Sequence, residues 1–212
     1  MKISTDPVDF TRDQLVENDL AACPFQQFEN WYGEAEEFGI EAPNAMSLAT
    51  ASKEGLPTIR TVLLKDYDKN GFVFFTNYGS QKAQQIEENP HASLLFPWIT
   101  MGRQVIVKGS VARVSKKESL NYFLSRPRLS QLGAWASNQS KSVDTRALLD
   151  QAFQQIKTRF QEGKIPLPDF WGGYRVSVET IEFWQSRKNR LHDRLQYEKG
   201  KEDSWLVSRL NP

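Results

Sequence analysis

Short segments with the composition of β-strands, separated by tight-turn residues, recur through most of this chain. They are predicted at 45–51, 57–66, 71–76, 92–99, 103–114, 173–178, 180–184, 191–197 and 205–210. Lys53-Glu54-Gly55 and Asp68-Lys69-Asn70-Gly71 indicate hairpin-like turns between the first of these strands. Many short strands linked in this way pair antiparallel and favour a closed or nearly closed β-barrel.

Helical periodicity interrupts the strands at 24–39, 80–89, 115–126, in a short piece to about 135, and at 144–160. Ser115-Lys116-Lys117-Glu118 is a capping box that opens the third helix, and Pro127 is expected to break that helix after Arg126. The predicted fold class is therefore α+β, mainly β, with a single domain over 23–212. Residues 1–22 sustain no period, and we expect them to form a flexible N-terminal arm.

The charge balance limits the classes of partner. The 212 residues include 27 Lys and Arg against 26 Asp and Glu, a net charge of +1. So balanced a charge disfavours a general nucleic-acid binder. No apolar run approaches the roughly 18 residues of a membrane span, and the polar terminus MKISTDPVDF lacks the apolar stretch of a signal peptide. We expect a soluble, cytoplasmic globular protein.

Metal and nucleophile chemistry have few residues to draw on. His91 and His192 lie about a hundred positions apart, and Cys23 is the single cysteine. A structural zinc site needs four closely spaced nitrogen or sulfur ligands, so no metal site is expected. No G-x-S-x-G elbow, Walker loop or G-x-G-x-x-G motif occurs, which removes the usual anchors of hydrolase, P-loop and Rossmann interpretations.

Two cations bracket the apolar run Arg60-Thr-Val-Leu-Leu-Lys65. Positions 60 and 65 face opposite sides of a regular strand, so they can serve one ligand only if a bulge or a backbone contact intervenes. The alternative is that the two cations mark opposite rims of the barrel.

A second cationic segment is Arg190-Leu191-His192-Asp193-Arg194. In an extended strand its three basic side chains share one face. Such a row suits an anion and a planar ring, because arginine binds phosphate bidentately and stacks on π-systems. The alternative is a solvated edge strand, which natural sheets often decorate with charge.

Two helix starts add candidates for phosphate binding. Tyr122 and Arg126 lie one turn apart on a helical face, and Ser130 follows the proline break, where backbone N–H groups at a helix start favour an anion. Gly79-Ser80-Gln81-Lys82 also opens a helix. A Tyr–Arg pair on an exposed helix surface would give the same pattern, and a helix-start motif alone is weak evidence.

Several longer segments resemble the pyridoxine (pyridoxamine) 5′-phosphate oxidase family. They are RTVLLK (60–65), FFTNYGSQKAQQIEENP (74–90), LLFPW (94–98), RQV (103–105), YFLSRPRLSQLGAWAS (122–137), PDFWGGYRV (168–176), IEFWQ (181–185) and RLHDR (190–194). They follow the family order from about residue 25 to the C-terminus. The resemblance implies an FMN-binding split β-barrel with inserted and flanking helices. It also implies a homodimer that binds each flavin at the subunit interface.

The resemblance also implies which residues bind. Contacts to FMN are expected from Arg60, Thr61, Val62, Leu63, Leu64, Lys65, Phe75, Thr76, Gln81, Lys82, Gln104, Gln139, Ser140, Trp184 and Arg194. Contacts to the substrate are expected from Lys65, Tyr122, Arg126, Ser130, Arg190, Leu191 and His192. Arg190 and His192 would lie over the pyridine ring as the catalytic residues. Cofactor and substrate each carry a phosphate of charge near −2, which suits the many cations of these segments.

The implied activity is FMN-dependent oxidation of pyridoxine 5′-phosphate or pyridoxamine 5′-phosphate to pyridoxal 5′-phosphate. O₂ would be the acceptor, with release of H₂O₂, and of NH₃ from the amine. One alternative is a split-barrel flavin oxidase of another pathway, such as phenazine assembly. The other is a non-catalytic carrier of flavin or pyridoxal phosphate. The joint presence of Tyr122, Arg126, Ser130, Arg190 and His192 favours the oxidase.

Three positions depart from the family pattern. The chain has Gln81 where Arg is frequent, Phe75 where Tyr is common, and no Arg-x-x-Tyr element in Thr5–Phe10. An arginine restored at position 81 would add a charge-assisted contact and tighten FMN binding about tenfold, if the pocket has room. Alternatively, Gln81 points to solvent and another cation, such as Arg60, already neutralises the phosphate.

Overall fold

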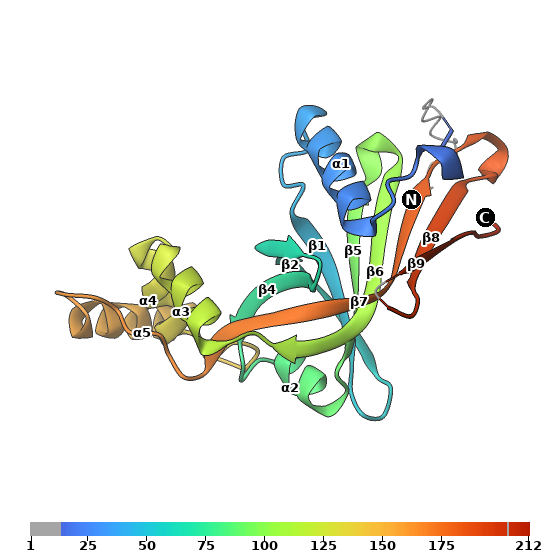
Figure 1. Ribbon diagram of the computed structural model, residues 1–212. Coiled ribbons are helices and arrows are strands. Elements are labelled where there is room, and N and C mark those ends of the chain that lie inside the picture. Colours follow the sequence, from blue (N-terminus) through green and yellow to red (C-terminus); the bar gives the residue numbers. More distant parts are fainter. Residues whose placement is uncertain (1–13, 203) are drawn as a thin grey trace, which may run out of the picture.

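The computed structural model describes residues 14–202 and 204–212, which are built on one nine-stranded sheet (Figure 1). The strands are β1 (Ala45–Ala51), β2 (Pro57–Leu63), β3 (Asp66–Asp68), β4 (Gly71–Asn77), β5 (His91–Trp98), β6 (Arg103–Arg113), β7 (Trp171–Gln185), β8 (Asp193–Lys199) and β9 (Trp205–Arg209). Their order is β2-β1-β5-β6-β7-β4-β3, with β8 beside β7 and β9 beside β8. The pairings are antiparallel, which confirms the mainly β, hairpin-linked prediction.

Strand β7 is the longest strand of the sheet and pairs with β4, β6 and β8. It runs unbroken from Trp171 to Gln185, so the prediction of two strands at 173–178 and 180–184 is wrong. Its first half pairs with β4 and its second half with β8, while β6 pairs along most of its length. The register shifts between Lys108 and Gly109, and Glu179 is the extra residue opposite them. A bulge of this kind disturbs the side-chain alternation without ending the strand, which is why the sequence pattern suggested a break.

Helix α1 (Pro24–Glu37) covers the core of the barrel. Its Phe28 is fully buried and packs edge-on against Phe72 and Phe96, with ring centroids 4.9 Å apart in each case. Helix α2 (Gln81–Glu88) follows β4 and packs against β1 through its buried face, which includes Ala83 and Ile86.

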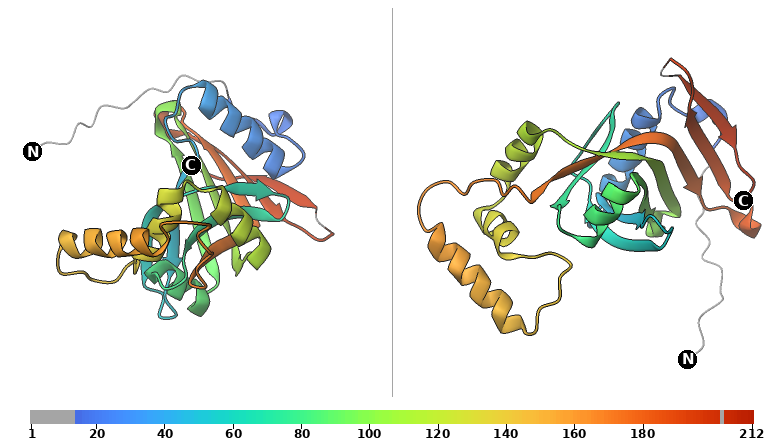
Figure 2. Two further views of the ribbon diagram at one scale, coloured as in Figure 1. Left: turned by 90° about the vertical axis from the view of Figure 1, so that its left-hand side faces the viewer. Right: turned by 90° about the horizontal axis from the view of Figure 1, so that it is seen from below.

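Helices α3 (Lys116–Ser125), α4 (Arg128–Ala136) and α5 (Arg146–Arg159) lie together to one side of the sheet, away from α1 (Figures 1 and 2). The predicted capping box at Ser115 and Glu118 is present, and the chain breaks between α3 and α4 at Pro127 as predicted. These helices and the start of β7 share a small hydrophobic core, and its buried residues include Phe123 and Trp171. Three short 3₁₀ turns, Glu17–Asp19, Ile99–Met101 and Lys188–Arg190, complete the elements.

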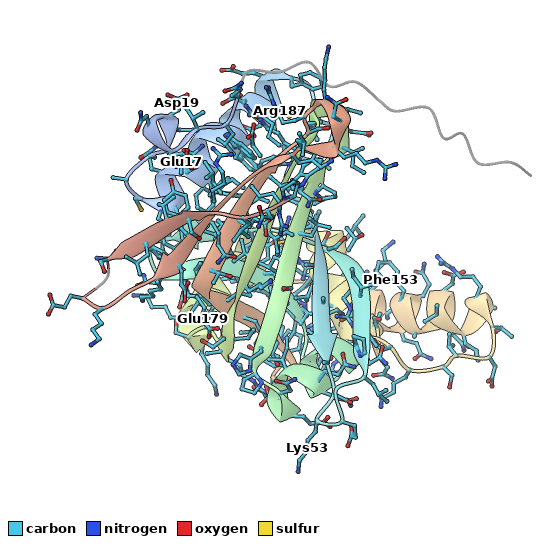
Figure 3. All side chains as sticks on the ribbon, turned by 90° about the vertical axis from the view of Figure 1, so that its right-hand side faces the viewer. Glu17, Asp19, Lys53, Phe153, Glu179 and Arg187 are labelled. Atoms are coloured by element: carbon cyan, nitrogen blue, oxygen red, sulfur yellow. The ribbon has the colours of Figure 1, made fainter. Side chains whose placement is uncertain are left out.

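Residues 14–22 of the predicted arm are in contact with the folded body. Leu15 is buried, the Glu17 carboxylate accepts from Arg209 Nε at 2.9 Å, and the Tyr197 hydroxyl donates to the carbonyl of Ala21 at 2.6 Å. Figure 3 shows Glu17 and Arg187 at one end of the molecule and Lys53 at the other. The remainder of the arm, residues 1–13, lies outside the described residues, as does the Thr5–Phe10 departure.

Candidate functional site

A cavity of about 760 Å³ lies between strands β2 and β4, helices α3 and α4, and the segment that follows α4. Its wall contains many of the residues predicted to bind cofactor or substrate. These are Arg60, Thr61, Val62, Leu63, Lys65, Phe75, Thr76, Lys82, Tyr122, Arg126, Ser130, Gln139 and Ser140. The fold thus brings residues from five separate segments of the chain to one site.

The charged side chains in the described lining of this cavity are all positive. Four cations line it, Arg60, Lys65, Lys82 and Arg126, and no Asp or Glu of the described residues does. Among residues 14–202 and 204–212, none of these four forms a salt bridge with a carboxylate. Cations gathered without acidic partners in a partly desolvated cleft are typical of an anion-binding site.

Arg60 and Lys82 form the first pair of cations. Burial, together with the nearby charge of Arg60, lowers the pKa of Lys82, and burial also lowers the pKa of Arg60. The Lys82 ammonium group donates to Thr76 Oγ1 and Gln139 Oε1, each at 3.4 Å. Because these acceptors are neutral, the charge of the lysine remains available to an anion.

Lys65 and Arg126 form the second pair. Burial and the charge of Arg126 lower the pKa of Lys65, and burial lowers the pKa of Arg126. The Arg126 guanidinium carbon lies 4.7 Å from the ring centroid of Trp171, and its Nη1 is buried with no hydrogen-bond partner among residues 14–202 and 204–212. A buried donor without a partner costs free energy, so this nitrogen is suited to donate to a bound anion.

Aromatic rings form a flat wall beside the cations. The Phe75 ring stacks on Tyr122 with centroids 4.0 Å apart, and on Trp171 with centroids 5.5 Å apart. Gly173 lies behind Phe75, and a Cβ at that position would come within 2.8 Å of the phenyl ring. The glycine therefore lets Phe75 lie close against β7, and the stack offers an apolar face to a planar ligand.

The two cations of the 60–65 segment reach the same cavity because the strand ends between them. Strand β2 stops at Leu63, so the predicted strand over 57–66 is too long. The Leu64 amide then donates to the carbonyl of Asn44, and the Lys65 amide donates to the carbonyl of Val73. The chain changes its pairing partner here, and the alternation of a regular strand no longer separates Arg60 from Lys65.

Two predicted cofactor residues of the same region lie outside the cavity wall. Leu64 is 5% exposed and belongs to the barrel core. Gln81 is the first residue of α2 and is exposed to solvent. This placement agrees with the alternative that other cations serve the phosphate, and it does not support a direct contact from Gln81.

The other predicted residues form a second group on β6, β7 and β8. Gln104, Trp184 and Arg194 are register partners across these three strands, and the His192 ring lies 4.6 Å from that of Trp184. Arg194 donates to the Glu182 carboxylate, with distances of 2.8 and 3.1 Å. The sequence did not predict this acidic partner of Arg194.

The prediction that residues 190, 192 and 194 share one face of an extended strand is wrong. Residues 188–190 form a 3₁₀ turn, and Asn189 and Arg190 have positive φ angles of 57° and 60°. Strand β8 begins only at Asp193. Arg190 and Leu191 are exposed, and the His192 Nδ1 atom accepts from the backbone N–H of Arg187 at 3.1 Å. A neutral His192 therefore carries its hydrogen on Nε2.

The two groups lie at different places in one copy of the chain. Trp171 lines the cavity at the start of β7, whereas Trp184 lies near the end of the same strand. None of Gln104, Trp184, Arg190, His192 and Arg194 lines the cavity of the same copy.

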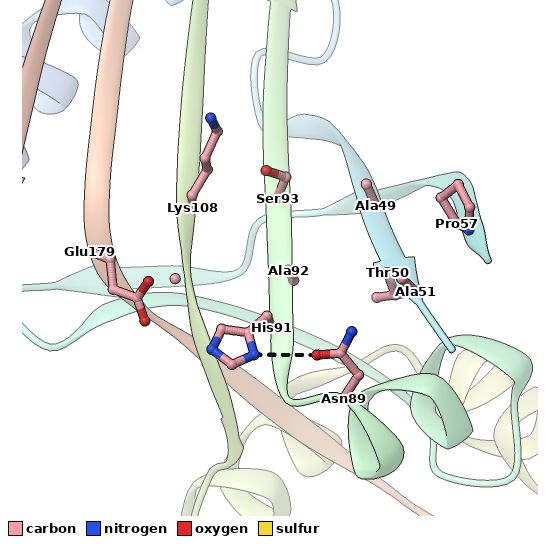
Figure 4. A pocket seen from close by; sticks show the side chains of 11 residues that line it. Ala49, Thr50, Ala51, Pro57, Asn89, His91, Ala92, Ser93, Lys108 and Glu179 are labelled. Atoms are coloured by element: carbon pink, nitrogen blue, oxygen red, sulfur yellow. Dashed lines mark hydrogen bonds between the residues drawn. The ribbon is translucent and has the colours of Figure 1, made fainter. Parts of the chain in front are cut away.

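A second hollow, of about 320 Å³, lies over β1, β5, β6 and β7 (Figure 4). His91 lies in it with Nδ1 3.3 Å from Asn89 Oδ1, and Lys108 and Glu179 also line it. It contains none of the predicted site residues. In the described part of the chain, no group of His, Cys, Asp and Glu side chains could hold a metal ion, and no helix is long and apolar enough to cross a membrane.

The sequence interpretation missed several residues of the cavity wall, namely Asn77, Pro127, Gly133, Ala134, Ser137 and Trp171. Each is close in sequence to a predicted residue or lies in a segment that carries the family resemblance. Trp171 had the strongest available signal, because it lies in the quoted motif PDFWGGYRV. Gly133 and Ala134 of α4 had a signal of the same kind, because they lie in the quoted motif YFLSRPRLSQLGAWAS.

Comparison with known proteins gives a consistent result. The family model described as pyridoxamine 5′-phosphate oxidase matches residues 33–160, and the pyridoxine 5′-phosphate oxidase C-terminal dimerisation region matches residues 171–212. A relative from Crocosphaera subtropica, named pyridoxine/pyridoxamine 5′-phosphate oxidase, is 57% identical over 206 residues, which is 96% of each chain.

Two solved structures have a similar fold. PhzG from Burkholderia lata, in complex with tetrahydrophenazine-1-carboxylic acid, is 27% identical, has a TM-score of 0.87, and is matched over 94% of this chain and 98% of that chain. A pyridoxamine 5′-phosphate oxidase-related, FMN binding protein from Nostoc punctiforme is 16% identical, with a TM-score of 0.73 over 91% of this chain and 100% of that chain. These likenesses confirm the predicted split β-barrel fold. With matching family models over most of its length and a relative more than half identical, the chain belongs to the pyridoxamine 5′-phosphate oxidase family.

Proposed function

We propose that this protein oxidises pyridoxine 5′-phosphate and pyridoxamine 5′-phosphate to pyridoxal 5′-phosphate, with FMN as cofactor and O₂ as acceptor. With the alcohol, one O₂ is consumed and H₂O₂ is released; with the amine, water is also consumed and NH₃ is released. The observation that carries this proposal is the cavity in which four cations without acidic partners lie beside an aromatic stack. The names of its close relatives support the substrate class.

The residues of the cavity fit FMN by the chemistry of their donors. A phosphate of charge near −2 needs cationic donors, and Arg60 and Lys82 lie together with neutral partners only. The exposed edge strand β2 and the Phe75 ring offer a polar backbone and a flat apolar face to a ring system. FMN, when bound, supplies the hydride acceptor and the reactivity toward O₂.

The second pair of cations suits the substrate phosphate. Burial and the nearby charge of Arg126 lower the pKa of Lys65, and Tyr122 and Ser130 line the same cavity. The buried Nη1 of Arg126 would donate to a phosphate oxygen. These residues would fix the substrate at its phosphate end, so that the reacting carbon is aligned rather than activated by a protein nucleophile.

We further propose that the site is shared between two copies of the chain. Gln104, Trp184 and Arg194 of one copy, with Arg190 and His192 from the turn before β8, would complete the cavity of the other copy. The cavity lining supports this arrangement, because it contains none of these five residues from the same copy. The match of residues 171–212 to a dimerisation region supports it independently.

In that arrangement Arg190 and His192 would orient the pyridine ring. Because His192 Nδ1 already accepts a hydrogen bond from the backbone, Nε2–H is the group that remains to meet a ligand. Orientation is the primary role, since hydride transfer requires alignment first.

The rival function is a flavin oxidase of phenazine assembly. One observation favours it, namely the likeness to PhzG, whose structure contains tetrahydrophenazine-1-carboxylic acid. That protein is 27% identical to this chain, whereas the relative from Crocosphaera subtropica is 57% identical. The presence of Tyr122, Arg126 and Ser130 at one cavity wall also favours a phosphorylated substrate.

An H₂O₂ assay separates these possibilities. The purified protein, saturated with FMN, is given pyridoxine 5′-phosphate, pyridoxamine 5′-phosphate or a dihydrophenazine carboxylic acid. We expect H₂O₂ and pyridoxal 5′-phosphate from the first two. Turnover of the phenazine alone would establish the rival function, and flavin binding without any turnover would establish a carrier. Failure to bind flavin would refute all three.

Complementation tests the shared site. Arg126→Met removes a cavity residue, and His192→Ala removes a residue of the second group. If the groups meet across two copies, a co-expressed heterodimer of the two impaired variants has one intact site and regains about half of the wild-type kcat/KM per dimer. A heterodimer whose kcat/KM is as low as that of its parents would place both groups in the same copy and contradict the proposal.

A further inference from the structure

The Arg60 guanidinium group donates hydrogen bonds to neutral oxygen atoms of residues outside the cavity wall. Its Nη1 donates to the carbonyl of Leu48 at 3.0 Å and to Thr50 Oγ1 at 2.7 Å, and its Nη2 donates to Thr58 Oγ1. None of these three acceptor residues lines the cavity. The guanidinium group is therefore oriented without a carboxylate that would neutralise it.

Gln85 on α2 sets the direction of these hydrogen bonds. The hydroxyls of Thr50 and Thr58 both donate to Gln85 Oε1, each at 2.6 Å. A hydroxyl has a single hydrogen, so both threonine oxygens are left to accept from Arg60. Thr50 and Gln85 are 3% and 7% exposed, which protects the network from competition by water.

We propose that Thr50, Thr58 and Gln85 are positioning residues that preorganise Arg60 for the phosphate of FMN. This inference rests on the proposed function and deepens it. Arg60 lies on β2, at the edge of the sheet, where a long side chain would otherwise sample many rotamers. Ordering such a side chain only when the ligand binds costs affinity, and a side chain that is already held avoids that cost.

The network also explains how the site functions with glutamine at position 81. Gln81 is exposed and outside the cavity wall, so Arg60 and Lys82 supply the positive charge there. Helix α2 still contributes through Gln85, on its buried face, which reaches Arg60 by way of the two threonines.

The test compares FMN with riboflavin, which lacks the phosphate. The full chain, stripped of flavin, is titrated with each by quenching of flavin fluorescence. The double variant Thr50→Val, Thr58→Val keeps the shape of the side chains and removes both hydroxyls. We expect its Kd for FMN to rise about tenfold, and its Kd for riboflavin to change less than about twofold. The double variant Thr50→Ser, Thr58→Ser should restore the wild-type Kd.

A matched pair on α2 gives a second measurement. Gln85→Met removes the acceptor of both hydroxyls, whereas Gln84→Met changes the exposed neighbour on the same helix. We expect only the former to weaken FMN selectively. If the double valine variant fails to fold, Thr58→Val alone, at a partly exposed position, carries the same comparison.

The outcomes separate this inference from the proposed function. Equal weakening of FMN and riboflavin would mean that the threonines and Gln85 serve stability alone, and would overturn the inference. Unchanged binding of both flavins by the variants would also overturn it, with the oxidase assignment intact. A wild-type protein that binds neither flavin would instead refute the proposed function.

Discussion

Replacement of Arg126 by methionine should separate recognition of the substrate phosphate from the stability of the fold. The guanidinium group has a buried Nη1 without a partner and lies over Trp171 at 4.7 Å. Methionine keeps an unbranched apolar side chain against the ring and removes both the charge and the hydrogen-bond donors.

The expected loss follows from the donors removed. Hydrogen bonds to a charged group contribute about 1.5–3 kcal/mol. A guanidinium bound to phosphate in this half-buried cleft should lie near the upper end, so about 3 kcal/mol is lost, or roughly a hundredfold in kcat/KM. Most of this loss should appear in KM, because the phosphate end is held equally in the ground state and the transition state.

The stability of the free protein should change little. Removal of a buried unsatisfied donor relieves about 1–3 kcal/mol, while loss of the cation–π contact costs about 0.5–2 kcal/mol. These effects oppose one another, so we expect the free energy of unfolding to change by about 1 kcal/mol or less, or roughly 3 °C in Tm for a chain of this size.

The assay measures kcat/KM for pyridoxine 5′-phosphate and for unphosphorylated pyridoxine. We expect Arg126→Met to lower the first about a hundredfold and to leave the second nearly unchanged. Arg146→Met is the control, since Arg146 is exposed and its ion pair among the described residues is with Asp150 on α5. An equal loss for both substrates, or a fall in Tm of about 10 °C or more, would refute the assignment of Arg126 to the phosphate.

Three further predictions test other parts of the molecule. Arg190→Ala and His192→Ala should retain FMN and lose kcat/KM, measured by flavin content and initial rate; wild-type kinetics in both would remove them from the site. Gln81→Arg should change the Kd for FMN less than about twofold, because position 81 is exposed outside the cavity wall; a tenfold gain by fluorescence titration would show that the missing charge was not compensated. Hydrogen bonding to Arg209 holds the pKa of Glu17 at about 2, below its ordinary value of about 4.3, so the contact stabilises the fold above about pH 4.3 and is lost as the pH falls toward 2. The difference in Tm between wild type and Glu17→Gln should therefore shrink on acidification, and a difference independent of pH would exclude this ion pair as its cause.

Local chemistry made much of this fold predictable from the sequence. The turn residues between the first strands, the capping box at Ser115 and the break at Pro127 act within a few positions, and the structure has all of them. The family motifs also led to most of the cavity wall, including both pairs of cations. These signals are readable because their physical causes are contained in the motif itself.

The tertiary structure decided what depends on pairing between distant segments. The register of β6 against β7 kept 171–185 as one strand despite a bulge, and the change of partner after Leu63 placed Lys65 in the wall of the same cavity as Arg60. The positive φ angles at 189 and 190 broke a row of basic residues that alternation alone had predicted.

The same holds for the placement of Arg60. Its hydrogen-bonding partners come from β1 and β2, and those partners are in turn fixed by Gln85 from α2. Side-chain contacts between residues so far apart in sequence leave no periodic trace, because they depend on how helices and strands pack rather than on the spacing within either. The sequence by itself determined which residues are cationic, aromatic or turn-forming, and only packing determined which of them meet.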